Sequence, residues 1–128
     1  MESKTLGQLE LEVLKIVWDK KSCTVPQAAE VLAKQKGYAR TTILTVIQRL
    51  HKKGFLSRKK EDGVFHYSPT EKKTTVLGNL ARTFVDSIFE GSSAELVQHL
   101  TTGEVTNEEL VRIRKIIDDA IAADGAKK

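Results

Sequence analysis

The chain contains 128 residues, of which 40% are hydrophobic. This length fits one domain, or one small domain with an appendage, and the apolar content is too high for a chain that is disordered throughout. No apolar run approaches the roughly 18 residues that a membrane span needs, and Met1–Lys4 do not open a signal peptide. We therefore expect a cytoplasmic protein without membrane insertion.

The residue types that carry chemistry are few and scattered. A single cysteine, Cys23, excludes a disulfide within the chain and is interpreted as a small turn or core residue rather than a thiol sensor. The three histidines, His51, His66 and His99, lack the spacing of metal ligands. No nucleophile motif or glycine-rich phosphate loop occurs, so we expect neither an enzyme nor a cofactor or metal site.

The charge is distributed unevenly. The formal net charge is +4 and the pI is about 9.2. Residues 1–69 carry 13 basic and 7 acidic side chains, a net charge of +6, whereas residues 70–128 carry 8 and 10, a net charge of −2. This division predicts a domain that binds a polyanion, residues 1–69, followed by a domain with another role, residues 70–128.

Two helices are predicted before the most basic region. The first runs from about residue 7 to residue 20, with Gly7 as an acceptable N-cap and Glu10 at the position from which a capping-box acid reaches back to the N–H of the cap. The second begins after Thr24, whose capping-box partner is Gln27. A short turn separates the two helices, as in a helix-turn-helix motif.

A third helix is predicted between Ala39 and Lys53, inside a stretch from Lys34 to Lys60 that holds nine Lys or Arg residues and no acid. Apolar residues at helical spacing form one face of it: Ile43, Val46, Ile47 and Leu50. The other faces carry hydroxyls, an amide, cations and one leucine: Thr41, Thr42, Leu44, Thr45, Gln48, Arg49 and Lys52. Because solvated surface helices commonly mix both signs of charge, this pattern favours a helix that enters a DNA groove.

A β-hairpin is predicted after the third helix. The turn signal Asp62-Gly63 separates two short runs, residues 55–61 and 64–68. Three helices followed by a two-stranded ribbon make a winged helix. Cations stand beside the turn, where a wing can touch the phosphate backbone: Arg58, Lys59 and Lys60. They favour DNA contact over a purely structural ribbon.

Three further helices are predicted beyond Pro69, and their apolar positions cover a wide arc. We expect them to form a homodimer interface through these residues: Val76, Leu77, Leu80, Phe84, Ile88, Leu110, Ile113 and Ile117. So small a unit cannot bury such an arc alone, which favours a second copy of the chain over packing against the winged helix. The expected fold class is therefore mainly α with a small β-hairpin wing: a winged helix-turn-helix domain followed by a three-helix dimerisation region.

The sequence resembles the penicillinase repressor (BlaI/MecI/CopY) family in four places. These are residues 9–18 (LELEVLKIVW), Thr24-Val25, residues 41–55 (TTILTVIQRLHKKGF) and Tyr67-Ser68-Pro69. The similarity covers nearly the whole chain, and the block Thr-Thr-x-x-Thr-x-x-x-Arg-Leu-x-x-Lys-Gly is fairly specific. The resemblance implies a dimeric winged-helix repressor of transcription that binds a palindromic operator.

The resemblance also bears on how repression ends. Members of the β-lactam-responsive branch control antibiotic-resistance genes, and a membrane sensor-protease triggers cleavage in their C-terminal dimer region. The cleaved Asn-Phe pair of those members corresponds here to His99-Leu100, which makes this bond the possible cleavage site. The copper-responsive branch carries paired Cys-x-Cys motifs near its C-terminus, and residues 70–128 contain no cysteine.

Expected contacts with a double-stranded DNA operator fall into two classes. At the start of the third helix, five residues can reach base edges: Arg40, Thr41, Thr42, Leu44 and Thr45. Six cations are expected to contact phosphates: Arg49, Lys52, Lys53, Arg58, Lys59 and Lys60. Repression then needs no chemistry, because a dimer that occupies a promoter excludes polymerase.

Two other functions remain open from the residues alone. A winged-helix module can bind another protein and never DNA, although such modules lack a uniformly cationic third helix. A regulator of the same architecture can instead respond to a small effector that binds in its dimer region.

Overall fold

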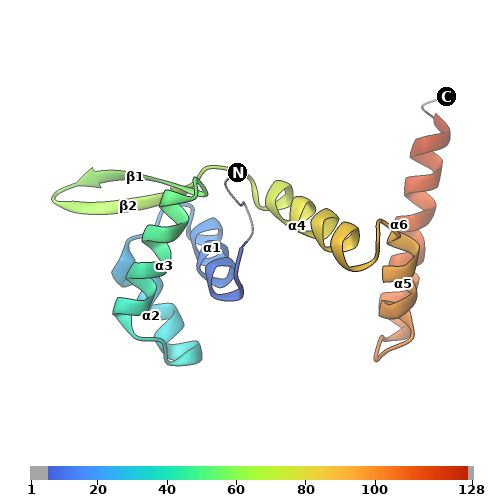
Figure 1. The fold of residues 1–128 in the computed structure, drawn as a ribbon, viewed down its shortest axis with the longest axis horizontal. Coiled ribbons are helices and arrows are strands. Elements are labelled where there is room, and N and C mark those ends of the chain that lie inside the picture. Colours follow the sequence, from blue (N-terminus) through green and yellow to red (C-terminus); the bar gives the residue numbers. More distant parts are fainter. Residues whose placement is uncertain (1–5, 127–128) are drawn as a thin grey trace. The chain divides into compact units, whose positions relative to one another are not determined.

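The computed structural model describes residues 6–126 and divides the chain into two compact units, Met1–Leu80 and Ala81–Lys128 (Figure 1). The elements, in chain order, are α1 (Gln8–Lys20), α2 (Val25–Lys36), α3 (Arg40–Lys52), β1 (Leu56–Glu61), β2 (Val64–Pro69), α4 (Lys73–Ile88), α5 (Ser93–Thr101) and α6 (Asn107–Ala126). The first unit is a winged helix and further helices follow it, which confirms the predicted fold class of a mainly α chain with a β-hairpin wing. The dimerisation role of the later helices stays a prediction. No helix among the described residues is both long and apolar enough to span a membrane.

The predicted start signals of α1 and α2 are present as hydrogen bonds. The Gly7 amide donates to Oε1 of Glu10 at 2.7 Å. The Thr24 amide donates to Oε1 of Gln27 at 2.9 Å, and the Gln27 amide donates to the Thr24 hydroxyl at 3.3 Å. Gly37 follows α2 in the left-handed conformation that favours glycine, with φ of 72°. Local sequence therefore fixes where both helices begin and where α2 ends.

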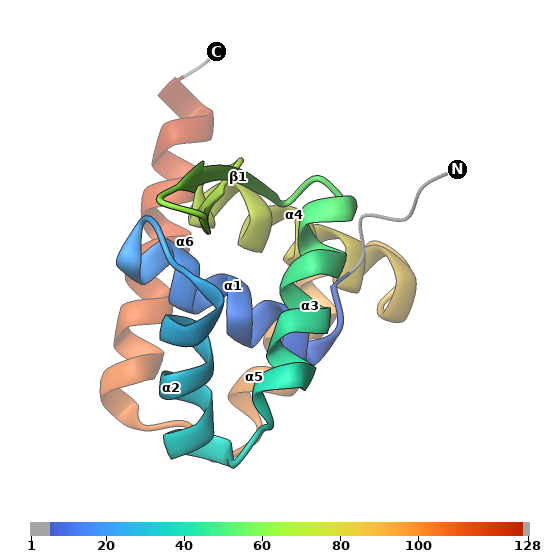
Figure 2. The same ribbon diagram turned by 90° about the vertical axis from the view of Figure 1, so that its left-hand side faces the viewer.

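Helices α1, α2 and α3 pack around one apolar core, and the hairpin continues from the C-terminal end of α3 (Figure 2). The four residues predicted to form the buried face of α3 are no more than 4% exposed: Ile43, Val46, Ile47 and Leu50. They meet buried residues of the other two helices, among them Val13, Leu14, Val17, Ala28, Ala29 and Leu32. This packing fixes the orientation of α3 about its own axis.

The hairpin has the tight turn that its sequence predicts. Asp62 and Gly63 both have positive φ, 51° and 77°, as in the type I′ turn that matches the twist of paired strands. In addition to the pairing of β1 with β2, Tyr67 of β2 forms an isolated bridge with Cys23. The backbone N–H of each residue donates to the carbonyl of the other, at 2.9 and 2.8 Å. Cys23 is fully buried, and burial raises the pKa of its thiol.

The first unit continues past the hairpin into α4. The indole N–H of Trp18 donates to the carbonyl of Glu71 at 3.0 Å and ties the linker to α1. Val76, on α4, is 4% exposed and belongs to the core of the winged helix, and Leu80 packs against that core. The compact unit therefore ends at Leu80, eleven residues beyond the Pro69 boundary expected from charge and hairpin signals.

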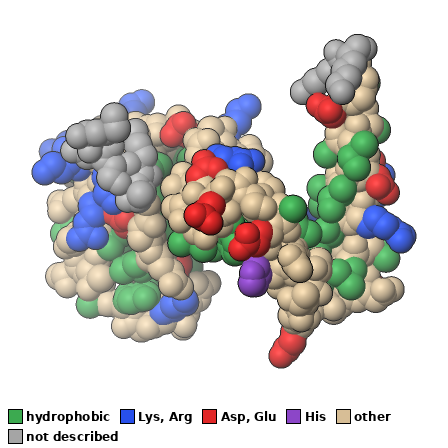
Figure 3. Space-filling view, turned by 45° about the vertical axis from the view of Figure 1, so that its right-hand side comes forward, with side chains coloured by type: hydrophobic (Ala, Val, Ile, Leu, Met, Phe, Trp, Pro, Cys, Tyr) green, Lys and Arg blue, Asp and Glu red, His purple; other side chains and the backbone are tan. Residues whose placement is uncertain are grey.

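The second unit contains little core of its own. Among its described residues, only Val85 is a buried hydrophobic side chain. No residue of α5 or α6 is buried. Two ring contacts, Phe84 with Phe89 and Phe89 with His99, have centroid distances of 5.7 and 5.5 Å. Apolar side chains are left on the surface, as Figure 3 shows along the C-terminal part of the chain.

A buried ion pair ties α1 to the end of α3. Glu10 is 4% exposed, and Nζ of Lys53 lies 2.9 Å from each of its carboxylate oxygens. The guanidinium of Arg49 lies 4.0 Å from the same carboxylate. Since Glu10 also caps α1 through Gly7, one carboxylate joins the first turn of α1 to the last turns of α3.

These contacts lower the pKa of Glu10. Burial alone raises that pKa, but the hydrogen bonds from the Gly7 amide and Lys53, with the charges of Lys53 and Arg49, outweigh it. A carboxylate with a lowered pKa contributes stability above its ordinary pKa, and that contribution is lost as the pH falls through the lowered value.

We expect Lys53→Met to lower the free energy of unfolding by about 1.5–3 kcal/mol, because a buried carboxylate loses its nearest cation. Lys36→Met is the matched control: Lys36 pairs with Glu12 at 3.1 Å, but its side chain is 46% exposed. The control should change stability by less than about 1 kcal/mol. Urea unfolding followed by the fluorescence of Trp18, the single tryptophan, measures both. Equal losses in the two variants would contradict an anchoring role for the Glu10 pair.

Candidate nucleic-acid interface

The residues predicted to read bases all lie on the exposed side of α3. These are Arg40, Thr41, Thr42, Leu44 and Thr45. Leu44 is 39% exposed although it is apolar and belongs to no core. The Thr45 side chain is exposed, and its hydroxyl donates to the carbonyl of Thr41 at 3.0 Å, which holds the side chain against the helix. Apart from Arg40, the start of α3 thus presents short or medium-sized side chains that a groove can accommodate.

The three cations at the end of α3 that were predicted to contact phosphates differ from one another in exposure and in their ion pairs. Lys52 is exposed, and the side chain of Arg49 is 52% exposed although it lies near Glu10. Lys53 is 24% exposed and bonded to the buried carboxylate of Glu10. We therefore reassign Lys53 from a phosphate contact to a structural anchor, because its ammonium already neutralises a buried charge.

The cations of the wing lie on two sides of the hairpin. Arg58 pairs with Tyr67 and Lys60 with Phe65 across the strands, so both cations share the side on which Tyr67 is buried. Lys59 lies on the opposite side, where its Nζ is 3.7 Å from Glu61. The run of three cations in the sequence is therefore two cations on the core-facing side of the wing and one on the outward side.

Acids from outside the basic stretch neutralise some of its cations. Lys36 pairs with Glu12, Lys53 with Glu10 and Lys59 with Glu61. Within residues 6–126, no carboxylate lies in ion-pair distance of the five other cations of this stretch: Lys34, Arg40, Lys52, Arg58 and Lys60. Lys34 lies on α2, and the other four lie on α3 and the core-facing side of the wing, where they make a surface suited to a polyanion.

Two residues of this region were missed by sequence reasoning about binding. Glu10 was read only as a cap, and nothing in the sequence shows that it also meets Lys53 of α3. Phe65 was read only as a strand residue, yet it is 37% exposed and the Arg58 guanidinium carbon lies 4.2 Å from its ring centroid. The alternation of the hairpin, which places residues 58, 60, 65 and 67 on one side, was the available signal.

The residues predicted to form a dimer interface divide between the two units. Val76 is buried in the core of its own chain, so we withdraw it from the interface. Leu80 packs against the same core but is only partly buried, so it stays in the predicted interface. The others remain partly or largely accessible: Leu77, Phe84, Ile88, Leu110, Ile113 and Ile117. Four further large hydrophobic residues of α5 and α6 are exposed and were not included in the predicted interface: Leu100, Val111, Ile116 and Ile121.

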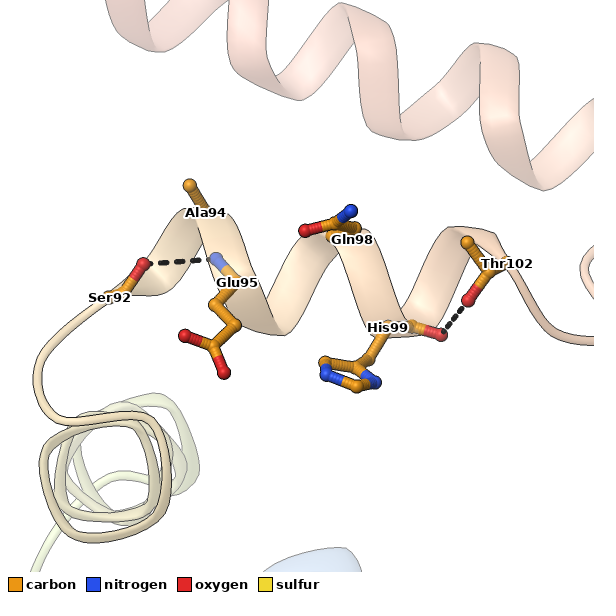
Figure 4. Close-up of a pocket in the computed structure, with 6 residues that line it drawn as sticks. All are labelled: Ser92, Ala94, Glu95, Gln98, His99 and Thr102. Atoms are coloured by element: carbon orange, nitrogen blue, oxygen red, sulfur yellow. Dashed lines mark hydrogen bonds between the residues drawn. The ribbon is translucent and has the colours of Figure 1, made fainter.

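The possible cleavage bond lies inside a helix. His99 and Leu100 are both exposed and belong to α5. His99 lines a pocket of about 530 Å³. The residues that line this pocket all come from α5 and its ends, and Figure 4 draws them as sticks. Ser92 caps this helix by accepting the Glu95 amide at 3.1 Å, and the Thr102 hydroxyl donates to the His99 carbonyl at 3.2 Å. No group of three or more potential metal ligands occurs among the described residues.

Comparisons with known proteins agree with this architecture. The family model for the penicillinase repressor matches residues 6–119. The methicillin resistance regulatory protein MecI of Staphylococcus aureus (strain N315) is 30% identical over 121 residues, which cover 92% of this chain and 98% of that protein. A penicillinase repressor of Staphylococcus aureus is 30% identical over 115 residues, which cover 89% and 91%.

A solved structure adds a likeness in fold to these sequence matches. The solution structure of the DNA binding domain of the repressor BlaI is 33% identical, with a TM-score of 0.52, and covers 58% of this chain and 92% of that domain. The family match over residues 6–119, with relatives that align along nearly their whole length, shows that the chain belongs to the penicillinase repressor family.

Proposed function

We propose that this chain is a transcriptional repressor that binds a palindromic DNA operator as a homodimer, and that the genes it controls include β-lactamase or other antibiotic-resistance genes. The observation that carries the proposal is the exposed side of α3, where hydroxyls and cations stand without a carboxylate. The names of the relatives support it: MecI is a methicillin resistance regulatory protein, and the matched BlaI structure is a DNA binding domain.

In this proposal α3 lies in the major groove, which is wide enough to admit a helix. Its first two turns supply the base contacts, from Arg40, Thr41, Thr42, Leu44 and Thr45. Arg49 and Lys52 bind phosphates at one edge of the groove, and Arg58 and Lys60 bind them from the wing. Phosphate contacts fix the register of the protein on the duplex, and contacts with base edges provide the sequence preference.

The second unit supports the proposal of a homodimer. Exposed large hydrophobic residues on α4 and α6 include Phe84 at 48%, Ile88 at 60% and Ile117 at 41% exposure. A unit with a single buried apolar side chain among its described residues gains stability only when another surface covers these positions. A second copy of the same chain supplies an identical apolar surface, and its two-fold symmetry fits a palindrome.

For the release of the operator we propose cleavage of the His99–Leu100 bond by a membrane sensor-protease. Water adds across the peptide bond, and the products are a chain that ends at His99 and a fragment that carries α6. A protease needs extended backbone, so α5 must unfold locally. That step costs little for a nine-residue helix with no buried side chain. Loss of α6 removes much of the apolar dimer surface.

The first prediction from the proposed function concerns base reading. We expect Thr45→Ala to relax specificity at one base position of the operator, with a loss of about 1–3 kcal/mol for the preferred base. Selection of bound duplexes from a random library, followed by titration of single-base variants, measures the change. A variant that weakens binding to every sequence by the same factor would contradict base reading by Thr45.

The second prediction concerns the wing. Lys60→Ala should weaken binding to all sequences and make the slope of log affinity against log salt shallower by about 0.9 for each phosphate that the variant no longer neutralises. Lys59 was also expected to contact phosphate, but it lies on the outward side beside Glu61, so we withdraw it from the proposed contacts. Lys59→Ala is therefore the matched control and should leave the slope nearly unchanged. An unchanged slope for Lys60→Ala would place this side of the wing off the DNA.

The third prediction concerns the dimer. Ile117→Glu should weaken the dimer by at least about tenfold, because it buries an unpaired carboxylate in an apolar interface. Asp119→Lys is the control, since position 119 lies about 160° around α6 from position 117. Sedimentation equilibrium of the full chain measures both. A monomeric wild-type chain would refute the homodimer outright.

The fourth prediction concerns cleavage. A chain that ends at His99 should be monomeric and should bind duplex DNA more weakly than the full chain, because it lacks α6. A chain that ends at Ala123 keeps most of α6 and serves as the control. Sedimentation and fluorescence anisotropy measure the two properties. DNA affinity equal to that of the full chain would show that cleavage at this bond cannot release the operator.

A further inference from the structure

An aromatic ring lies beneath the two cations on the core-facing side of the wing. The guanidinium carbon of Arg58 is 4.2 Å from the ring centroid of Phe65, and Nζ of Lys60 is 5.6 Å from it. Lys60 stands directly opposite Phe65 in the strand pairing, and Arg58 is its diagonal neighbour. The buried ring of Tyr67 lies 6.2 Å from the Phe65 ring and supports it from the side of the core.

Phe65 is not required to fill the core. Its side chain is 37% exposed, whereas Tyr67, two residues later on the same side of the strand, is 2% exposed and closes the core. The negative face of an aromatic ring attracts cations, and a planar guanidinium stacks on it well. The arrangement therefore restrains two long side chains that otherwise move freely.

The position of this cluster relates it to α3. Arg58, Lys60 and Phe65 share the side of the hairpin on which Leu56 and Tyr67 are buried against the helices. The hairpin projects from the helices beyond α3, as Figure 1 shows. The part of its core-facing side near the turn therefore extends past the core and lies next to the exposed side of α3. If α3 lies in a DNA groove, the phosphates at the edge of that groove would lie close to this side of the hairpin.

We propose that Phe65 is a positioning residue for DNA binding: its ring holds Arg58 and Lys60 in the orientation in which they meet phosphates. The inference rests on the proposed function, because it assumes that the wing contacts DNA. Cations that are already restrained lose less conformational freedom when they bind. An exposed cation–ring contact predicts a loss of about two- to fivefold in affinity for each subunit, and about 5- to 30-fold for a dimer.

The test compares Phe65→Leu, which keeps apolar bulk but removes the ring, with Phe65→Tyr, which keeps the ring. Binding of the full chain to a fluorescein-labelled duplex of random sequence is measured by anisotropy at low salt. Each substitution is also made in a chain that carries Arg58→Gln and Lys60→Gln. Thermal unfolding, followed by the fluorescence of Trp18, reports whether each variant is folded.

We expect Phe65→Leu to weaken binding within the predicted range, Phe65→Tyr to bind like the wild type, and Phe65→Leu to have no further effect once both cations are replaced. An effect of the same size in the double-glutamine background would overturn the proposal, because the ring would then act without the cations. So would wild-type affinity in Phe65→Leu, or a loss of affinity that accompanies unfolding. If the wild-type chain itself ignores duplex DNA, the proposed function fails instead.

Discussion

The burial of one stripe of α3 is the constraint on which the rest of the binding surface depends. Ile43, Ile47 and Leu50 are fully buried, and a rotation of the helix by one position, about 100°, would bring them out of the core. Their burial therefore determines that the threonines and cations face outward. The Glu10–Lys53 pair adds a polar contact at the far end of the helix, so that α3 is held both about its axis and at its end.

Predictions that rested on local spacing were confirmed, because the interactions that determine those features join residues only a few positions apart. The cap of α1 by Glu10, the capping box of α2, the apolar stripe of α3 and the turn at Asp62-Gly63 are of this kind. Lys53 could not be assigned in the same way. Its partner, Glu10, is 43 positions away in the sequence, and the acid-free stretch from Lys34 to Lys60 says nothing of acids that α1 brings to it. The three adjacent cations of the wing were read as one group, although the alternation of a strand separates them.

The two units differ in how their apolar residues are used. In the first, side chains from three helices, the hairpin and α4 meet in one core, and Val76 shows that this core reaches further along the chain than charge or turn signals indicate. In the second, apolar periodicity predicts the helices but not their partners, because a stripe at helical spacing is the same whether its own chain or another copy covers it. Periodicity therefore identified the correct helices here, while Val76 was assigned to the wrong neighbour.

The hydrogen bond from Thr45 to Thr41 in the first turns of α3 determines whether the Thr45 hydroxyl can donate or accept a further hydrogen bond. Its hydroxyl proton is donated to the Thr41 carbonyl, so the oxygen can only accept while that hydrogen bond is kept. In the major groove such an acceptor is matched by the exocyclic amino groups of adenine and cytosine and repelled by the keto oxygens of thymine and guanine. In the proposed complex, the base nearest Thr45 would then be selected as much by electrostatic rejection of the wrong base as by attraction to the right one.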